Sequence, residues 1–446
     1  MALGYSQQTE EGICNVKRRQ FAAGALALAG TALAGGARPG RAEEKVVLSF
    51  LHKWPEPDNV VFFNNAIEAY TKAHPNVTIN AEAVADEPYK AKIRVVMASG
   101  DVPDIYFTWV GEFTRQFIRG GRVLDLSPYL AKPEWQGRFS QATLNAYRTD
   151  GKFYGIPLNL DAKFFMYNKT LFEKAGISAP PATWPQFEAV CDKLKAAKIQ
   201  PISFGSQLAW ATSHYVGDFN AKLVPIAVRE SDYLLKTPAD KLFTDPGYVQ
   251  ALEYYTSMLT KGWFNKTPNA FTHAVARAAF HAGRSSMLYD ELVSFGRAAG
   301  TKLEKDGWDF FPMPAIPGGR GDQALLTGAP DGFVVSPKCK HPEVALDFLN
   351  FLTTRAQGAE YTRITKRTSA VIGAVTSANA SPQVLRGIDV INAAKGMVIW
   401  LDTDMESRVG SAYLAGAQAL MGGTETPAQV MAKVRAAALQ AQKERS

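Results

Sequence analysis

Cysteine is scarce in this sequence, which has three copies, Cys14, Cys191 and Cys339, among 446 residues. So low a content excludes a small scaffold held together by disulfides. The six histidines are scattered, and neither an HExxH pair nor a cysteine cluster has the spacing of metal ligands. No glycine-rich loop of the kind that cradles phosphates is present either. We therefore expect no metal site and no cofactor.

Blocks of lysine and arginine are also missing beyond the first 42 residues, although the chain carries a formal net charge of +7. Part of that charge belongs to the N-terminal segment, which contains Lys17, Arg18 and Arg19. Nucleic-acid binding requires a basic patch or stripe. The sequence therefore predicts no nucleic-acid partner.

Residues 1–42 have the pattern of an export signal. A weakly apolar stretch rich in alanine and glycine runs from Ala22 to Gly36 after the basic residues, and small residues near Ala42 suit cleavage. This stretch is too short and too rich in glycine to anchor in a membrane. The adjacent Arg18 and Arg19, followed by x-Phe, resemble the twin-arginine signals of bacteria. We expect the rest of the chain to be periplasmic.

Strand and helix patterns alternate in the first part of the remaining chain. They predict strands at 45–51, 77–83 and 104–109 and helices at 58–74 and 89–99. A β-α-β-α-β order indicates a parallel α/β sheet, and such sheets bind ligands beyond the carboxyl ends of their strands. Trp54, Trp109 and Glu112 lie just past two of these ends. A tryptophan at such a position is either core or site, and two at equivalent strand ends favour a site.

The stretch from Gly151 to Lys169 connects this part to a second one. Its glycines mark a turn, and apolar runs before and after it indicate that the chain crosses in extended form. Asn159 and Asp161 are polar side chains among apolar neighbours at the crossing. They are either solvated turn residues or ligand contacts, because sites commonly lie between two lobes.

The second part contains a predicted helix at 185–198, where Cys191 lies on the apolar face, and a predicted strand at 285–289 followed by Asp290 and Glu291. Trp210 and His214 lie in a polar region between them. The segment 325–336 and a helix at 341–353 are predicted to rejoin the first part. Residues from about 357 onward, including Arg408, are predicted to be helical and to close the second part.

Five segments in this order resemble the family 1 extracellular solute-binding proteins, the carbohydrate-binding subunits of bacterial ABC importers related to maltose-binding protein. They are SGDVPDIYF at 99–107, GKFYGIP at 151–157 with YNKTLFEKAGI at 167–177, PPATWPQF at 180–187, GRSSM at 283–287 and SPKCKHPEVALDFLNFL at 336–352. The resemblance implies a two-lobe α/β fold of type II, with a hinge of crossing strands and a ligand cleft between the lobes. The implied lobes are 43–156 plus 314–355 and 157–313 plus 356–446. They separate Cys191 from Cys339, so both should be free.

The resemblance also implies a monomeric protein that binds a sugar, delivers it to a membrane permease and has no catalytic residue. Sugars suit aromatic planes combined with carboxylates and amides. The implied ligand-binding residues are Lys53, Trp54, Trp109, Glu112, Asn159, Asp161, Trp210, His214, Asp290, Glu291, Gly328, Asp331 and Arg408.

Two alternatives stay open. A secreted glycoside hydrolase would also place carboxylates such as Glu112, Asp161 and Glu291 near aromatic residues, although a mobile hinge does not hold a carboxylate pair at fixed spacing. The second alternative is a protein that binds a polyol, a glycerol-phosphate-type solute or another small polar solute. An anionic solute would need converging arginines. The acidic residues favour a neutral polyhydroxylated ligand or a cationic one.

Overall fold

The first lobe is built on a sheet of five strands in the order β2-β1-β3-β11-β6 in this computed structural model, which describes residues 44–394 and 396–445. The strands are β1 (Val46–His52), β2 (Val77–Ala83), β3 (Ile105–Thr108), β6 (Ile156–Pro157) and β11 (Gly332–Val335). β1 pairs in parallel with both β2 and β3, as the alternating pattern predicts. β11 lies antiparallel between β3 and β6, so a segment from late in the chain completes the sheet. The predicted export signal lies outside the described residues.

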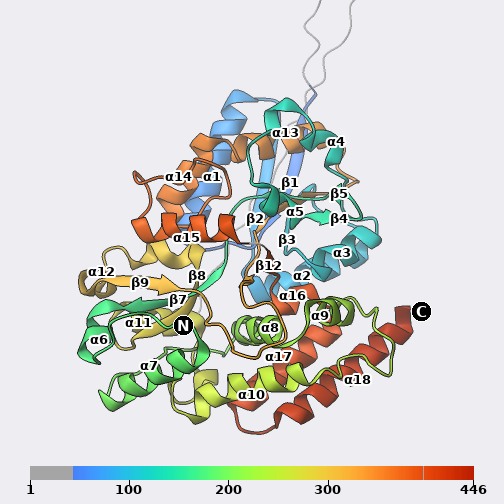
Figure 1. The fold of residues 1–446 in the computed structure, drawn as a ribbon. Helices are drawn as coiled ribbons and strands as arrows, with labels where there is room; N and C mark the ends of the chain where they lie inside the picture. The colour runs from blue at the N-terminus through green and yellow to red at the C-terminus, as the bar shows by residue number, and fades with distance from the viewer. Residues whose placement is uncertain (1–43, 395, 446) are drawn as a thin grey trace, which may run out of the picture. The chain divides into compact units, whose positions relative to one another are not determined.

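Helices cover this sheet because each buries one apolar face against it. They include α1 (Pro57–Ala73), α2 (Asp86–Ser99), α13 (Pro342–Leu352) and α14 (Arg355–Thr365). The ring of Phe62 on α1 meets Tyr361 on α14 with centroids 5.1 Å apart, and Figure 1 shows the two helices together. Because α14 packs on α1, we propose that the first lobe extends to Thr365, ten residues beyond the implied boundary.

Shorter elements connect β3 to the crossing. They are α3 (Glu112–Arg119), α4 (Ser127–Leu130), η1 (Pro133–Trp135), α5 (Gln141–Asn145), β4 (Arg148–Thr149) and β5 (Lys152–Phe153). The strands β4 and β5 form a small antiparallel hairpin that turns at Asp150 and Gly151. Gly151 therefore lies in a turn, as the sequence predicts, whereas Gly155 lies between β5 and β6.

The second lobe contains a sheet of three antiparallel strands in the order β8-β7-β9. These are β7 (Lys163–Asn168), β8 (Met287–Glu291) and β9 (Trp308–Phe311). Alternate residues of β7 enter different clusters, with Phe165 in the second-lobe core and Phe164 in the cluster that continues into the first lobe. The sheet is thus buried on both faces, which explains the unbroken apolar run in its sequence.

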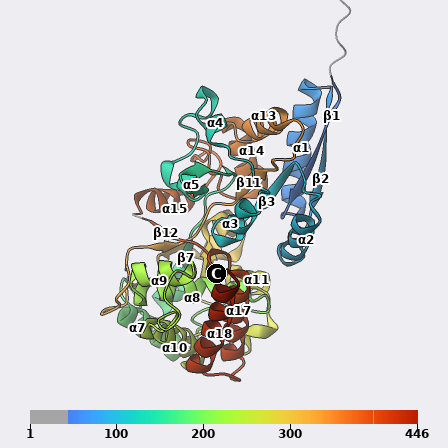
Figure 2. The ribbon, with the colours of Figure 1, turned by 90° about the vertical axis from the view of Figure 1, so that its right-hand side faces the viewer.

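Helices make up most of the second lobe, and Figures 1 and 2 show α7, α8, α10, α17 and α18 together below its sheet. Its elements before the return are α6 (Lys169–Lys174), α7 (Trp184–Ala196), α8 (Trp210–Leu223), α9 (Ile226–Tyr233), α10 (Pro246–Thr260), η2 (Pro268–Ala270), α11 (His273–His281), η3 (Leu292–Ala298) and α12 (Lys302–Asp306). The later elements are α15 (Pro382–Ala393), β12 (Met397–Val398), α16 (Leu401–Asp404), α17 (Ser407–Met421) and α18 (Pro427–Arg445). The short β10 (Leu326–Thr327), from the segment that the resemblance gives to the first lobe, pairs in parallel with β12. Cys191 is buried on α7, and both described cysteines are free thiols.

Three segments run side by side where the chain passes between the lobes. The amide of Leu158 donates to the carbonyl of Asp331 at 2.8 Å, and the amide of Leu160 donates to the carbonyl of Thr368 at 3.0 Å. Gly328 lies so close to the first crossing that a Cβ atom there would be 2.4 Å from the carbonyl oxygen of Asp161. Only glycine permits this approach, so Gly328 positions the crossing segments.

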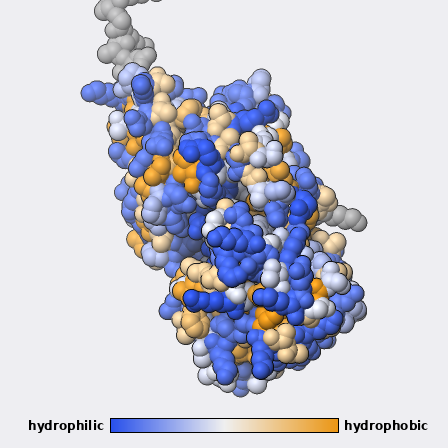
Figure 3. Space-filling model, turned by 90° about the vertical axis from the view of Figure 1, so that its left-hand side faces the viewer, coloured by the Kyte–Doolittle hydropathy of each residue, from blue (hydrophilic) through white to orange (hydrophobic). Residues whose placement is uncertain are grey.

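The surface view in Figure 3 is mostly hydrophilic, with apolar residues scattered among charged ones. Such scattering is ordinary for a protein surface in water. Within residues 44–394 and 396–445, none of the helices combines the length and the apolar character that a bilayer crossing requires.

Candidate functional site

A cavity of about 420 Å³ receives side chains from both lobes. Seven of the residues predicted for the site line it, namely Lys53, Trp54, Trp109, Trp210, His214, Glu291 and Asp331. Its volume lies in the range of pockets that hold small ligands. The cavity is therefore the candidate site.

The topology of the first sheet explains why the first lobe contributes Lys53, Trp54 and Trp109 to the lining of the cavity. Lys53 and Trp54 follow β1, and Trp109 follows β3, which pairs in parallel with β1. The carboxyl ends of parallel strands meet at one edge of a sheet. These side chains therefore converge from separate parts of the sequence.

Indole rings form much of the apolar lining. Trp54 is 1% exposed and packs on Phe63, while Trp109 packs edge-on against Phe107. On the other side, the ring of His214 lies between Trp210 at 5.2 Å and Trp400 at 4.5 Å. The indole nitrogens of Trp54 and Trp210 are buried without a hydrogen-bond partner among the described residues. Two donors of the lining are thus unsatisfied within the described chain.

Lys53 forms a buried ion pair at the floor of the cavity. Its ammonium lies 3.0 Å from Asp331 and 3.6 Å from Asp86, and 4.9 Å from the centre of the Trp109 ring. Burial lowers the pKa of Lys53, but the two carboxylates outweigh it and raise the pKa above its ordinary value. Lys53 is therefore a fixed cation that holds Asp331 in place.

A second ion pair, at the wall of the cavity, connects the two lobes. Lys90 on α2 lies 3.1 Å from Asp402 on α16, and also 3.0 Å from Glu87 on its own helix. The pKa of Lys90 is raised, because these carboxylates outweigh the effect of burial. Asp402 also accepts a hydrogen bond from Ser213 on α8.

On the second-lobe side, Asp290 is fully buried behind the lining. Arg277 donates two hydrogen bonds to it at 2.6 and 2.8 Å, and His273 lies 3.0 Å from it. Burial raises the pKa of Asp290, but these two neighbours outweigh it and hold the pKa well below the ordinary value. Asp290 thus neutralises Arg277 and does not itself line the cavity.

The two histidines of the lining are neutral. Burial lowers the pKa of His214 well below its ordinary value, and the charges of Lys163 and Lys90 lower it further. Burial also lowers the pKa of His273, against the opposing effect of Asp290. A neutral imidazole can donate one hydrogen bond and accept another, which suits a hydroxyl group. One ring nitrogen of His273 is already occupied by Asp290, so its other nitrogen alone is left.

Asn159 and Asp161 support the cavity from the crossing and do not line it. The side-chain oxygen of Asn159 accepts the amide of Asp331 at 3.0 Å, which positions the partner of Lys53. Asp161 accepts the amide of Val293 at 3.3 Å. Burial raises the pKa of Asp161 well above its ordinary value, and the charges of Glu291 and Asp331 raise it further. Gly328 belongs to the same supporting layer.

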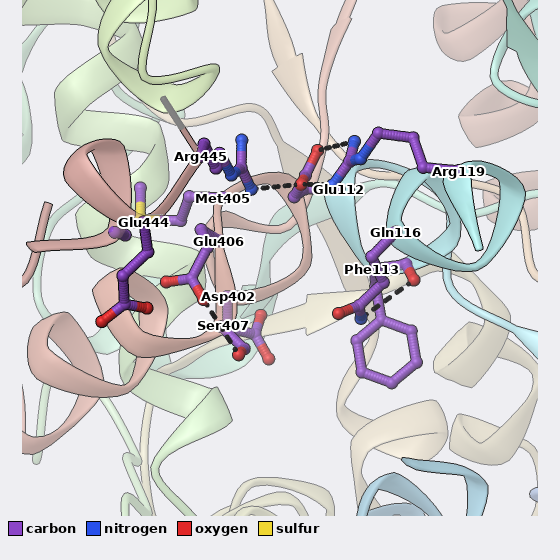
Figure 4. A pocket seen from close by; sticks show the side chains of 11 residues that line it. Glu112, Phe113, Gln116, Arg119, Asp402, Met405, Glu406, Ser407, Glu444 and Arg445 are labelled. Carbon is purple, nitrogen blue, oxygen red and sulfur yellow. Dashed lines mark hydrogen bonds and ion pairs between the residues drawn. The ribbon is translucent and has the colours of Figure 1, made fainter. Parts of the chain in front are cut away.

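Glu112 and Arg408 lie away from the cavity. Glu112 is 4% exposed in a separate hollow, where Figure 4 shows Arg119 and Arg445 pointing at its carboxylate. Burial raises its pKa, but Arg119 and Arg445 outweigh burial and lower it. Arg408 is exposed on α17 and pairs with Glu444 at 2.8 Å. We therefore do not carry these two residues into the proposed site.

Several lining residues were not predicted from the sequence. They are Glu56, Asp86, Lys90, Leu208, Thr272, His273, Ala274, Arg277, Ser294, Arg297, Arg367, Trp400, Asp402 and Thr403. Most lie on helix faces or in loops far from the family-like segments. Trp400 follows the short β12, as Trp54 follows β1 and Trp109 follows β3, so its position after a strand is a signal that could have pointed to it. No group of three or more potential metal ligands occurs in the part of the chain that the structure describes.

Comparison with known proteins decides the family. Residues 54–359 match the family model of the bacterial extracellular solute-binding proteins. The chain belongs to this family. Its members are exported binding proteins, and the resemblance recognised in the sequence is thereby confirmed.

Curated relatives of this solute-binding protein cover most of its length. A binding protein of Brucella abortus is 26% identical over 68% of this chain and 71% of its own. The multiple sugar-binding protein of Streptococcus mutans is 22% identical over 77% of this chain and 79% of its own. The arabinooligosaccharide-binding protein of Bacillus subtilis is 24% identical over 71% of this chain and 67% of its own.

Solved structures share the fold. A chitin oligosaccharide binding protein superimposes with a TM-score of 0.79 at 24% identity, covering 90% of this chain and 98% of its own. A protein solved in a study of xylan utilisation by a thermophilic bacterium also reaches a TM-score of 0.79, at 20% identity, covering 88% and 99%. These likenesses confirm the predicted two-lobe α/β fold.

Proposed function

We propose that this solute-binding protein captures a sugar, as a mono- or oligosaccharide, in the cavity between its lobes and delivers it to the permease of an ABC importer. The observation that carries the proposal is the lining of indole rings beside buried polar atoms that lack partners within the described chain. A pyranose has apolar C–H faces that stack on aromatic rings and a rim of hydroxyls that donate and accept. The lining offers both.

The named relatives support the same substrate class. The Streptococcus mutans and Bacillus subtilis proteins are named for sugars, and so is the chitin oligosaccharide binding protein. Among the predicted residues, we propose Lys53, Trp54, Trp109, Trp210, His214, Glu291 and Asp331 as direct contacts. Asn159, Asp161, Asp290 and Gly328 would position them.

The charges of the cavity argue for binding without catalysis. A glycosidase needs a carboxylic acid at the cavity whose pKa is raised, so that it can protonate the leaving group. Glu291 lines the cavity, but its pKa is lowered, because Lys163 outweighs the effect of burial. Asp161 has a raised pKa, but it accepts the amide of Val293 and lies outside the lining. Asp218, Asp232 and Asp404, whose pKa values are also raised by burial, lie outside the lining as well. We infer that the sugar leaves unchanged.

The remaining steps follow from the two-lobe fold. A ligand that contacts both lobes stabilises the closed form, and a permease can recognise that form. We propose that the protein works as a monomer in the periplasm after export by the twin-arginine route.

A thermal-shift screen of the purified full-length chain against mono- and oligosaccharides tests the proposal, because a ligand raises stability by RT ln(1 + [L]/Kd). Trp210→Ala should reduce the shift by weakening affinity by about 1 kcal/mol or more, since Trp210 lines the cavity and is partly exposed. Arg408→Gln, outside the cavity, serves as the matched control. A screen without any shift would contradict the proposal, and product formed from an oligosaccharide would favour the hydrolase.

A further inference from the structure

Five basic side chains other than histidine line the cavity, and they differ in how they are neutralised. These are Lys53, Lys90, Arg277, Arg297 and Arg367. The first three each have a carboxylate oxygen within 3.1 Å. The nearest carboxylates of the last two lie 3.9 and 4.0 Å away. The last two cations of the lining therefore lack a close partner in the described chain.

Arg367 is the more enclosed of the two. Its side chain is 15% exposed, and its Nε atom is buried without a hydrogen-bond partner among the described residues. Its nearest carboxylate belongs to Glu56, whose side chain is 43% exposed. A guanidinium presents five donors in a planar fork, and burial without acceptors is costly. Burial lowers the pKa of Arg367, but Tyr361 and the carboxylates of Glu56, Asp331 and Glu291 outweigh it and raise the pKa. The guanidinium is therefore charged, and its Nε donor stays unused within the described chain.

The guanidinium of Arg297 lies close enough to that of Arg367 for their positive charges to repel each other. Its pKa is lowered, first by burial and then by the positive charges of Arg367 and Arg277. Its nearest carboxylate, on Asp58, is 3.9 Å away and partly exposed. Two guanidinium groups that repel each other at one cavity are stabilised by an anion placed between them.

Both arginines lie next to the crossing segments. Arg367 precedes Thr368, whose carbonyl accepts the amide of Leu160 at 3.0 Å. Arg297 is on η3, whose residue Val293 donates to Asp161. The two arginines without a close carboxylate therefore lie at the hinge. Trp210 begins α8, and Trp400 directly precedes α16.

We propose that the sugar of this site is acidic, and that Arg297 and Arg367 hold its oxyanion while its ring stacks on the tryptophans. This rests on the proposed function, because it names the substrate class of the same cavity. A carboxylate or a phosphate fits the guanidinium fork, since both accept two parallel hydrogen bonds. Arg277 does not take part, because Asp290 already occupies its fork.

Pairs of sugars that differ only in charge test the proposal by calorimetry on the full-length chain. Glucuronate is compared with glucose, galacturonate with galactose, and glucose 6-phosphate with glucose. We expect an acidic member to bind about tenfold tighter or more than its neutral counterpart. Preference for the uronates identifies a carboxylate, and preference for the phosphate ester identifies a phosphate.

Variants separate this role from a merely structural one. Arg367→Gln and Arg297→Gln should each weaken binding of the acidic sugar about tenfold and change binding of a neutral sugar little. Glu56→Gln should strengthen binding of the acidic sugar, because it removes a carboxylate that competes for Arg367. Arg408→Gln is the control and should change neither.

The failures are distinguishable. If neutral sugars bind as tightly as their acidic counterparts, the acidic-sugar proposal is overturned while the proposed function stands. If neither kind binds at any concentration tested, both fail together.

Discussion

Two charged regions join the lobes, and they differ in whether their arginines have close carboxylate partners. In the hollow around Glu112, three arginines meet one carboxylate, and Arg445 lies 2.6 Å from it. At the hinge end of the cavity, Arg297 and Arg367 have no carboxylate within 3.8 Å in the described chain. An arginine whose donors are used holds the fold together, and one whose donors are free is available to a ligand.

Glu112 was predicted to contact the ligand because of its position after β3, but its helix directs the side chain elsewhere. Glu112 follows β3 and Trp109, but it begins α3, so its side chain turns toward Arg115 at 3.1 Å and Arg119 on the same helix. The spacing of three and seven residues was readable in the sequence. Arg115 continues to Asp404 at 3.1 Å on α16, so this region forms a contact between lobes.

The largest expected effect concerns the ion pair of Lys53 and Asp331, a cavity pair that resembles the Glu112 region because its charges are neutralised at close range. Asp331→Ala leaves the buried Lys53 without its 3.0 Å partner. We expect a loss of about 3 to 5 kcal/mol in unfolding free energy, measured by denaturant titration. The double variant with Lys53→Met should recover much of the loss. A single variant as stable as the parent would show that the pair is not structural.

Closure of the lobes near Glu112 depends on Gly111. Its φ of 89° suits glycine, and a Cβ atom there would lie 2.7 Å from the carbonyl oxygen of Thr403 on the other lobe. Gly111→Ala should weaken ligand binding by up to about 3 kcal/mol, because it strains the backbone and separates the lobes. Calorimetry with a ligand from the sugar screen measures it. Gly137→Ala, also at positive φ but open to solvent, controls for strain alone.

Acid should affect the two regions at different pH. The folded-state pKa of His214 is lowered, so the unfolded state takes up a proton first as pH falls below about 6.5, and stability falls by up to about 1.4 kcal/mol per unit. The pKa of Glu112 is also lowered, so its contribution is complete above about pH 4.3 and is lost only below that.

Unfolding free energies measured from pH 7 to 5 check this order. His214→Asn should flatten the dependence between pH 6.5 and 5, a difference of about 2 kcal/mol at pH 5. Glu112→Gln should leave the slope in that range unchanged. Equal slopes in the parent and His214→Asn would mean that the fold does not lower the pKa of His214.

The smallest effect separates contacts within a lobe from contacts between lobes. Arg445 on α18 and Arg119 on α3 both bind Glu112, but Arg445 is in the other lobe. Arg445→Gln should weaken ligand binding by up to about 1 kcal/mol, because it destabilises the closed form. Arg119→Gln removes a contact within α3 and should leave affinity unchanged. If both variants change the affinity equally in calorimetry, the contact between Arg445 and Glu112 does not specifically stabilise the closed form.

Much of the fold was predictable because it depends on local patterns. The β2 strand was predicted with its observed bounds, 77–83, and α1 to within a residue at each end. Apolar periodicity and strand-end positions are local properties, so they also placed Lys53, Trp54 and Trp109 at the cavity. The supporting role of Asp161 was less accessible, because it depends on an amide 132 residues away.

The sequence by itself determined that the chain has two α/β lobes, a crossing near Asp161 and an aromatic, polar cleft at the ends of parallel strands. Tertiary structure alone decided which charges are neutralised. Neutralisation depends on distances between residues far apart in the sequence, such as Arg367 and Glu56, and no local pattern encodes them. For that reason the sequence favoured a neutral ligand, whereas the arrangement of the arginines favours an acidic one.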